Sequence, residues 1–209
     1  MEIKRFYTGP FQTNCYLVWN DNKEAYFFDC EGERLEKVFD FIKQENLNLK
    51  YIVLTHGHGD HICGLNKLKR EFPEVTVYIG EEEKEFLHNS QLNLAPYIIG
   101  KDFSYEYGFK TLQNGDRVGE FTVIDTPGHT IGSKCFYNKE SKILISGDTM
   151  FRRSFGRYDL PTANGTQLFE SLAKLCAKLP EDTVVYSAHT EPTTIGEEKI
   201  FLTSQGFIK

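Results

Sequence analysis

The sequence has no long apolar run. No stretch approaches the ~20 consecutive apolar residues that a helix needs to cross a bilayer. Residues 1–7 contain no apolar segment of the kind that directs export. These absences argue against a membrane-spanning helix and predict a soluble protein that is not exported. We therefore expect it in the cytoplasm.

Paired cysteines are also lacking. The five cysteines are odd in number, lie far apart and include no Cys-x-x-Cys pair, which argues against a disulfide framework and against a zinc knuckle. We expect reduced thiols, several of them among apolar neighbours, where cysteine acts as a small hydrophobic residue.

Basic residues are fewer than acidic residues. Lys and Arg number 24 against 30 Asp and Glu, which gives a net charge of −6. This balance opposes the phosphate attraction on which nucleic-acid binding depends. We therefore expect a small-molecule substrate and neither nucleic acid nor membrane as a partner, while the composition leaves the oligomeric state open.

The length and composition predict one compact domain over residues 1–209. A chain of this size lies near the upper end of the usual single-domain range and buries a substantial core. Hydrophobic residues make up 40% of it, with 17 Phe and 11 Tyr. No linker, composition break or internal repeat divides the sequence.

Helix and strand signals alternate along the sequence, which is typical of an α/β fold. Short β-like runs predict strands over residues 2–7, 14–19, 25–29, 51–54, 75–79, 120–124, 134–137, 142–146 and 183–186. Apolar residues at helical spacing predict helices over residues 33–44, 62–70, 81–88 and 165–177. A capping-box pattern at 194–197 predicts a final short helix. Residues 89–110, interrupted by Asn, Pro and Gly, are expected to form a functional loop or lid.

Histidine is scarce but clustered. Of six histidines, three fall with an aspartate in one short run directly after a predicted strand: His56, His58, Asp60 and His61. Imidazole nitrogen and carboxylate oxygen suit zinc, iron or manganese. The small glycines between these residues would let the run face two neighbouring ions. The alternative is an ordinary turn whose histidines cap a helix or face solvent, and the density of the run favours metal.

Three further candidates each follow a predicted strand: His129, Asp148 and His189. Catalytic groups commonly lie on loops at strand ends, where a rigid scaffold holds them. In isolation Asp148 would be a turn residue and His189 a core histidine, but the order of all parts favours a metal site with Asp148 between two ions. The sixth histidine, His88, follows a charged run and is expected on a solvated helix face.

The ordered set His56-x-His58-x-Asp60-His61, His129, Asp148 and His189 resembles the metallo-β-lactamase superfamily over nearly the whole chain. Further segments resemble its glyoxalase II-like, or hydroxyacylglutathione hydrolase-like, branch: Gly9–Asn14, Thr126–Thr130, Ser146–Phe151 and Pro192–Gly196. That branch hydrolyses thioesters of glutathione. The resemblance implies an αββα sandwich of two mainly mixed β-sheets flanked by helices, with the site at one edge.

The resemblance also implies two divalent metal ions per chain, zinc above all, with iron or manganese as alternatives. The implied ligands are His56, His58 and His129 for the first ion, Asp60, His61 and His189 for the second, and Asp148 as a bridge. Two such ions acidify a shared water, which then attacks a carbonyl carbon without a separate base. We therefore expect a metal-dependent thioesterase in which Asp60, by orienting that water, and Asp148 are catalytic.

Substrate contacts are expected at Arg157 and Tyr158. In glyoxalase II a Gly-Lys pair at the similar place helps to hold the glutathione carboxylate, and Gly156-Arg157 stands there in this sequence. Arginine can pair bidentately with such an anion. The family tyrosine does not align cleanly, because position 159 is Asp. The sequence also ends at Lys209, without the C-terminal helical region that glyoxalase II uses for glutathione, so the thiol carrier can differ.

Two alternative activities share the motif. A sulfur oxygenase of the persulfide dioxygenase type resembles the same pattern but uses a single iron at the first site, so metal content and oxygen uptake distinguish it. A lactonase of the same fold is a second hydrolytic alternative. Ions that only stabilise a fold have closed coordination, whereas the implied ligand set leaves a position for water.

Overall fold

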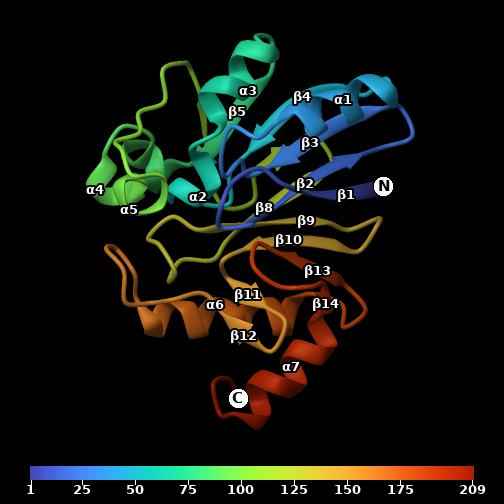
Figure 1. Ribbon diagram of the computed structural model, residues 1–209. Helices are drawn as coiled ribbons and strands as arrows, with labels where there is room; N and C mark the ends of the chain where they lie inside the picture. Colours follow the sequence, from blue (N-terminus) through green and yellow to red (C-terminus); the bar gives the residue numbers. More distant parts are fainter. The chain divides into compact units, whose positions relative to one another are not determined.

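The computed structural model describes residues 1–209, which divide into two compact units. The N-terminal unit is Met1–Thr111 and the C-terminal unit is Leu112–Lys209. Each contains a mixed β-sheet with flanking helices (Figure 1). The predicted α/β class with two mixed sheets is therefore confirmed, and the single domain over 1–209 stays a prediction.

The N-terminal unit contains a six-stranded sheet in the order β1-β2-β3-β4-β5-β6. Its strands are β1 (Glu2–Tyr7), β2 (Asn14–Trp19), β3 (Glu24–Phe28), β4 (Asn48–Val53), β5 (Thr76–Gly80) and β6 (Lys110–Leu112). The first three form an antiparallel meander, and β3, β4 and β5 are parallel. Its helices are α1 (Glu36–Gln44), α2 (Gly59–Ile62), α3 (Leu65–Glu71), the 3₁₀ helix η1 (Glu81–Leu87), α4 (Ser90–Asn93) and α5 (Ala95–Ile99).

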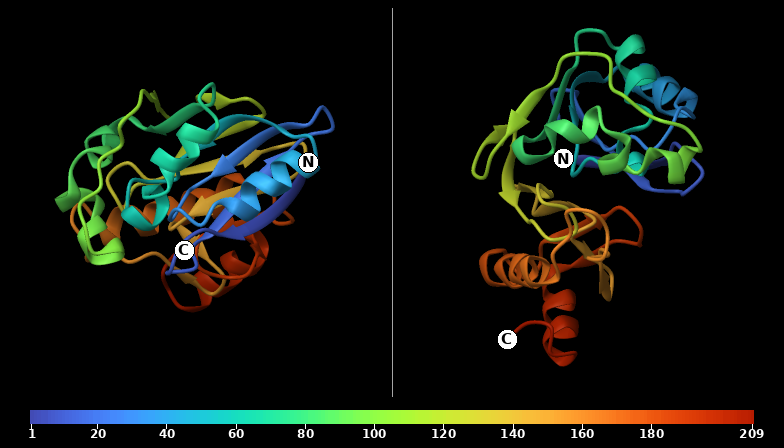
Figure 2. Two further views of the ribbon diagram at one scale, coloured as in Figure 1. Left: turned by 45° about the horizontal axis from the view of Figure 1, so that its top comes forward. Right: turned by 90° about the vertical axis from the view of Figure 1, so that its left-hand side faces the viewer.

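The helix α1 connects the parallel strands β3 and β4, as a crossover must, and covers one face of the sheet together with α3 (Figure 1, Figure 2). Val38 and Ile42 of α1 are buried and belong to the same hydrophobic cluster as Leu17, Phe27 and Ile52 of the sheet. Burial of this apolar face holds the strands in register, so that the loop after β4 leaves the sheet at a fixed place.

The C-terminal unit contains a second six-stranded sheet in the order β14-β13-β10-β9-β8-β7. Its strands are β7 (Arg117–Val118), β8 (Phe121–Asp125), β9 (Lys134–Asn138), β10 (Ile143–Gly147), β13 (Val184–Ser187) and β14 (Thr193–Thr194). A separate hairpin consists of β11 (Met150–Phe151) and β12 (Ser154–Phe155). Strands β10 and β13 are parallel and the other pairs are antiparallel.

Two helices, α6 (Gly165–Lys178) and α7 (Ile195–Ser204), lie on one side of this second sheet (Figure 1, Figure 2). The helix α6 provides the crossover between β10 and β13, and it buries Leu168, Leu172 and Leu175. The predicted cap of α7 is present, because the Thr194 hydroxyl accepts a hydrogen bond from the Glu197 amide at 3.2 Å.

Several predicted boundaries were wrong. The helix expected over residues 62–70 is two helices, α2 and α3, and the expected irregular segment 89–110 contains α4 and α5. Both short helices span only four or five residues, too few for apolar periodicity to reveal them. Gly64 separates α2 from α3, and a Cβ there would overlap the Cys30 sulfur. The two-residue strands β7, β11, β12 and β14 were also missed.

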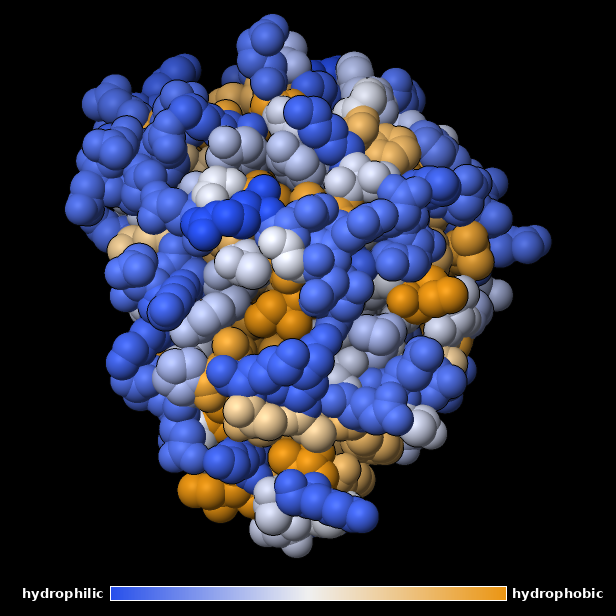
Figure 3. Space-filling model, turned by 180° about the vertical axis from the view of Figure 1, so that it is seen from behind, coloured by the Kyte–Doolittle hydropathy of each residue, from blue (hydrophilic) through white to orange (hydrophobic).

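No helix of the structure is both long and apolar enough to span a membrane. On the face drawn in Figure 3, hydrophobic colours gather at the lower end, where α6 and α7 lie. The C-terminal segment includes the exposed side chains Ile200 and Phe207. The Phe207 ring packs against Phe155 and Phe169 at centroid distances of 4.9 and 5.3 Å, so these aromatic residues attach the end of the chain to α6.

Candidate metal centre

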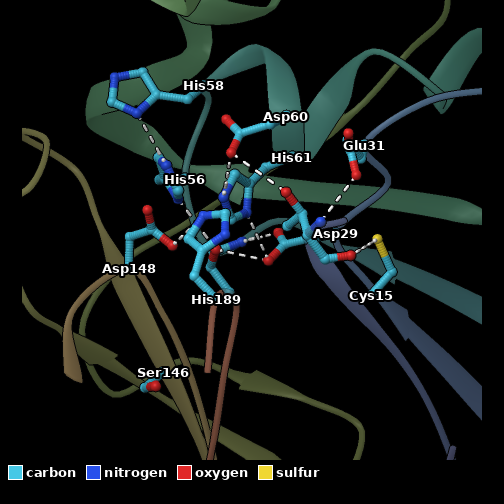
Figure 4. A network of polar contacts seen from close by, with 12 residues as sticks. Cys15, Asp29, Glu31, His56, His58, Asp60, His61, Ser146, Asp148 and His189 are labelled. Atoms are coloured by element: carbon cyan, nitrogen blue, oxygen red, sulfur yellow. Dashed lines mark hydrogen bonds and ion pairs between the residues drawn. The ribbon is translucent and has the colours of Figure 1, made fainter. Parts of the chain in front are cut away.

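The histidine run lies on the loop after β4 and continues into α2, as its position after a predicted strand indicated. His56, His58 and His61 are buried, whereas Asp60 is only partly so. The His56 Nε2 atom lies 3.1 Å from His58 Nδ1, and the ring centroids of His56 and His61 are 4.0 Å apart. Figure 4 shows these three imidazoles and the Asp60 carboxylate side by side. The N-terminal unit thus gathers four side chains able to bind a metal in a small volume.

A buried carboxylate behind the run sets the tautomer of His61. Asp29 follows β3, and its Oδ2 lies 3.0 Å from His61 Nδ1. The same carboxylate accepts hydrogen bonds from the Thr55 amide and hydroxyl, both at 2.8 Å. The carboxylate beside Nδ1 favours the His61 tautomer with the proton on Nδ1, which leaves on Nε2 the lone pair that a metal would need. Sequence reasoning missed Asp29, although it too directly follows an apolar strand.

A second buried carboxylate, also missed from the sequence, holds the turn between His56 and His58. The Glu83 side chain is fully buried on η1 and accepts a hydrogen bond from the Gly57 amide. A Cβ at position 57 would overlap the Phe86 side chain. Glycine is therefore required here, because the backbone passes so close to η1 that no side chain fits.

The three candidates of the C-terminal unit lie on loops after β8, β10 and β13. The Asp148 carboxylate lies between the other two, with Oδ2 at 3.5 Å from His129 Nε2 and Oδ1 at 3.3 Å from His189 Nε2. Figure 4 shows Asp148 and His189 of this group. The His129 Nδ1 atom lies 2.7 Å from the Arg157 carbonyl oxygen, so it donates its proton there and leaves the Nε2 lone pair available to a metal.

The loops of the C-terminal unit are held by main-chain contacts and by side-chain hydrogen bonds. A Cβ at Gly156 would overlap the main-chain oxygen of Asp148, so the β11–β12 hairpin and the Asp148 turn are in direct contact. The Arg152 amide donates to the Thr190 hydroxyl at 2.9 Å, next to His189. The Arg153 amide donates to Glu198 at 2.8 Å, and burial raises the pKa of that carboxyl group.

The two predicted substrate residues lie on the loop after the β11–β12 hairpin. Arg157 is exposed and makes two hydrogen bonds to the Asp159 carboxylate at 2.9 and 3.0 Å, which raises the pKa of Arg157 and lowers that of Asp159. Tyr158 is exposed, and its ring lies 5.7 Å from that of Phe169. Their role in substrate binding stays a prediction.

Two residues left out of the predicted site have other surroundings. His88 is exposed, and its Nδ1 lies 3.3 Å from the Ser104 hydroxyl. Cys63 is buried at the end of α2, and burial raises the pKa of its thiol to about 12. Cys63 belongs to the hydrophobic core cluster of this unit, which suits a packing role.

The chemistry of the candidate residues fits a divalent metal ion. The donors are imidazole nitrogens and carboxylate oxygens, a set that zinc, iron and manganese accept. The second ring nitrogen of His61 is held by a carboxylate and that of His129 by a carbonyl, which is the usual support for metal-binding histidines. The chain therefore carries His and Asp side chains able to bind a metal.

Comparisons with known proteins agree with this chemistry. A sequence model of the metallo-beta-lactamase superfamily matches residues 8–189. Hydroxyacylglutathione hydrolase GloC of Haemophilus influenzae is 32% identical over 208 residues, which cover 95% of each chain. The crystal structure of BLEG-1 B3 metallo-beta-lactamase aligns with a TM-score of 0.87 at 35% identity, over 95% of this chain and 97% of that one. TTHA1623, solved in a di-iron-bound form, aligns with a TM-score of 0.83 at 32% identity, over 94% and 96% of the two chains.

Proposed function

This chain belongs to the metallo-β-lactamase superfamily of hydrolases, and we propose that it cleaves small thioesters, with an acylglutathione as the first substrate to test. The observation that carries the proposal is the Asp148 carboxylate, whose two oxygens face the Nε2 atoms of different histidines. A carboxylate presented in this way can bind two ions, one through each oxygen.

We propose two divalent ions per chain, zinc first among them. The proposed ligands are His56, His58 and His129 for the first ion, Asp60, His61 and His189 for the second, and Asp148 for both. Two such ions, when bound, would bring the pKa of a water molecule close to neutrality and would polarise the carbonyl group of a substrate. That GloC of Haemophilus influenzae is called a hydroxyacylglutathione hydrolase supports the choice of substrate.

The residues of this chain have separate tasks in the proposed reaction. Asp29 keeps the Nδ1 proton of His61 in place, so that Nε2 stays available to a metal. The Asp60 carboxylate would accept a hydrogen bond from the attacking water and direct its oxygen at the acyl carbon. The C–S bond then breaks, and the products are a carboxylic acid and a thiol that has taken up a proton from the water.

Arg157 is the proposed contact for a carboxylate of the thiol carrier. Its guanidinium group is occupied by Asp159, so a substrate carboxylate would have to replace that partner. Both groups are exposed, and an exposed pair of this kind contributes little free energy. The exchange would therefore cost little.

We further propose that the protein works in the cytoplasm. Its five cysteines are all free and buried, which suits a compartment that keeps thiols reduced.

The decisive experiment is turnover of a small substrate panel by metal-loaded protein, with the His58→Ala variant as the control. We expect S-lactoylglutathione to be hydrolysed much faster by the wild type than by the variant, and equal rates would reject the glutathione thioesterase. Cleavage of lactones alone would indicate a lactonase. One iron per chain with thiol-dependent oxygen uptake would indicate a sulfur oxygenase.

A further inference from the structure

We propose that Glu31 is a positioning residue for the second metal ion and that it acts through Thr13 on Asp60. All three residues belong to the N-terminal unit. The inference rests on the proposed function, because it gives Asp60 a metal to bind. It concerns a carboxylate that no motif of the sequence singles out.

The Glu31 carboxylate holds the loop between β1 and β2. Its side chain is fully buried. One oxygen accepts a hydrogen bond from the Phe11 amide and the other accepts one from the Thr13 amide at 2.9 Å. Two amides that no strand pairs are thus satisfied by one side chain, and the main chain of the loop is fixed by it.

The loop is shaped around this carboxylate. Gly9 approaches Glu31 so closely that a Cβ at position 9 would overlap the carboxyl group. Gln12 has a positive φ of 57°, a conformation that a residue with a side chain rarely adopts. The loop therefore contains a strained residue, Gln12, and surrounds a buried acid, Glu31. Each of these features costs free energy and persists only where other contacts compensate for that cost.

The contact that reaches the site comes from Thr13. This residue is fully buried, and its hydroxyl donates a hydrogen bond to Asp60 Oδ2 at 3.3 Å. The same oxygen lies 3.6 Å from His61 Nε2. Figure 4 shows Glu31 and Asp60 beside the histidines of this unit. With Oδ2 held by a hydroxyl donor, rotation of the Asp60 carboxylate is restricted, and its orientation toward a metal is set from the loop.

The burial of Glu31 has a cost that its hydrogen bonds only partly offset. Desolvation raises the pKa of this carboxyl group and the charge of Asp60 adds to the rise, while the amides of Phe11 and Thr13 lower the pKa. A glutamine would fill the same space without a charge. Glutamine presents one acceptor oxygen and one donor nitrogen, so it cannot accept hydrogen bonds from both amides. This difference explains why a carboxylate is buried at this position.

Glu83 provides a natural comparison. It is equally buried and also accepts from a loop amide, but that amide belongs to Gly57, between His56 and His58. Glu83 therefore supports ligands proposed for the first ion, whereas Glu31 supports a ligand proposed for the second. Substitution of Glu83 should therefore lower the affinity for the first ion, and substitution of Glu31 should lower the affinity for the second.

The test is a zinc titration of metal-free protein followed by calorimetry, with bound zinc counted after dialysis. Thr13→Val removes the hydroxyl and keeps the shape of the side chain, and Thr13→Ser keeps the hydroxyl. We expect Thr13→Val to lower the affinity for the second ion by about 10-fold to 100-fold, the usual effect of losing an outer partner of a metal ligand. The first ion should bind normally, and Thr13→Ser should bind both ions as the wild type does.

Glu31→Gln should show the same selective loss of the second ion, and Glu83→Gln should instead weaken the first. If Glu31→Gln does not fold, as judged by circular dichroism, the two Thr13 variants still decide. Equal zinc affinities for Thr13→Val and Thr13→Ser would overturn the inference while leaving the proposed function intact. A wild-type protein that takes up only one ion would overturn the dinuclear function and this inference together.

Discussion

The two units present their candidate ligands in opposite ways. In the N-terminal unit four of them come from one run of six positions, and buried side-chain carboxylates such as Asp29 support the run. In the C-terminal unit three come from three separate loops, where His129 contacts the main-chain carbonyl of Arg157 and the Thr190 and Glu198 side chains hold the hairpin. The position of each ligand in a short run depends on the side chains that contact it. The positions of ligands on separate loops also depend on how the strands and the hairpin pack.

A support in the N-terminal unit is a side chain that can be replaced without moving the backbone, so its loss should reduce binding by a measurable factor. In the C-terminal unit the partner of His129 is a main-chain carbonyl, and the Asp148 turn lies against the main chain of Gly156, so these two supports can be disturbed only by displacing a loop. The largest effects of indirect substitutions are therefore expected in the C-terminal unit.

The largest effect of all should follow from Asp148→Ala. This change removes the carboxylate that lies between His129 and His189 and leaves two imidazoles with no shared partner. We expect loss of bound metal and a fall in kcat/KM well beyond the about hundredfold that loss of an outer support costs. Metal analysis of dialysed protein together with thioester turnover checks this, and retention of both would reject Asp148 as the bridge.

Gly156→Ala should come second, although it changes no candidate ligand. The added Cβ would overlap the main-chain oxygen of Asp148, so the Asp148 turn or the β11–β12 hairpin must shift. A displacement of about 1 Å at a catalytic group can cost roughly a hundredfold in rate. We expect a loss in kcat/KM of that order. Gly108→Ala is the matched control, since no atom lies within 4 Å of a Cβ there, and equal behaviour of the two variants would contradict the prediction.

Asp29→Asn is the corresponding change in the N-terminal unit. The amide keeps the size of the side chain but replaces one acceptor oxygen by a donor, so it cannot serve the Thr55 amide, the Thr55 hydroxyl and His61 together. We expect metal affinity to fall by about 10-fold to 100-fold, with the fold preserved. Zinc titration with circular dichroism measures both quantities, and unchanged affinity in folded protein would show that the His61 tautomer does not need this carboxylate.

The same contrast explains what could be predicted from the sequence. The run from His56 to His61 was recognisable because its donors are adjacent in the chain. His129, Asp148 and His189 could be proposed because each follows a strand that was predicted within two residues of its observed bounds. The structure brings Asp148 beside both histidines, which no spacing along the chain could establish.

The supports were not predictable from local patterns. Glu83 lies in a run of charged residues that suggests a solvated helix, yet its side chain is fully buried against the Gly57 amide. Glu31 and Asp29 act on residues far away in the sequence, and a single sequence carries no signal for such contacts. The short helices α4 and α5 were missed for a related reason, because packing and not periodicity determines them.

The smallest effect is expected from Thr190→Val, a side-chain support in the C-terminal unit. The Thr190 hydroxyl accepts from the Arg152 amide at 2.9 Å and lies 2.7 Å from the Ser187 hydroxyl. Its loss leaves the other contacts of the β11–β12 hairpin intact, including the one from the Arg153 amide to Glu198. We expect the free energy of unfolding to fall by about 1 kcal/mol. The metal affinity of Thr190→Val should lie closer to that of the wild type than the affinity of Asp29→Asn does.

Thr190→Ser keeps the hydroxyl and serves as the control. Denaturant unfolding of the metal-free proteins gives the stability difference, and zinc titration gives the affinity of each variant. If Thr190→Val lost as much metal affinity as Asp29→Asn, side-chain supports would matter equally in both units. The order of these two effects would then be wrong, because His189 would depend on its neighbour's hydroxyl as His61 depends on Asp29.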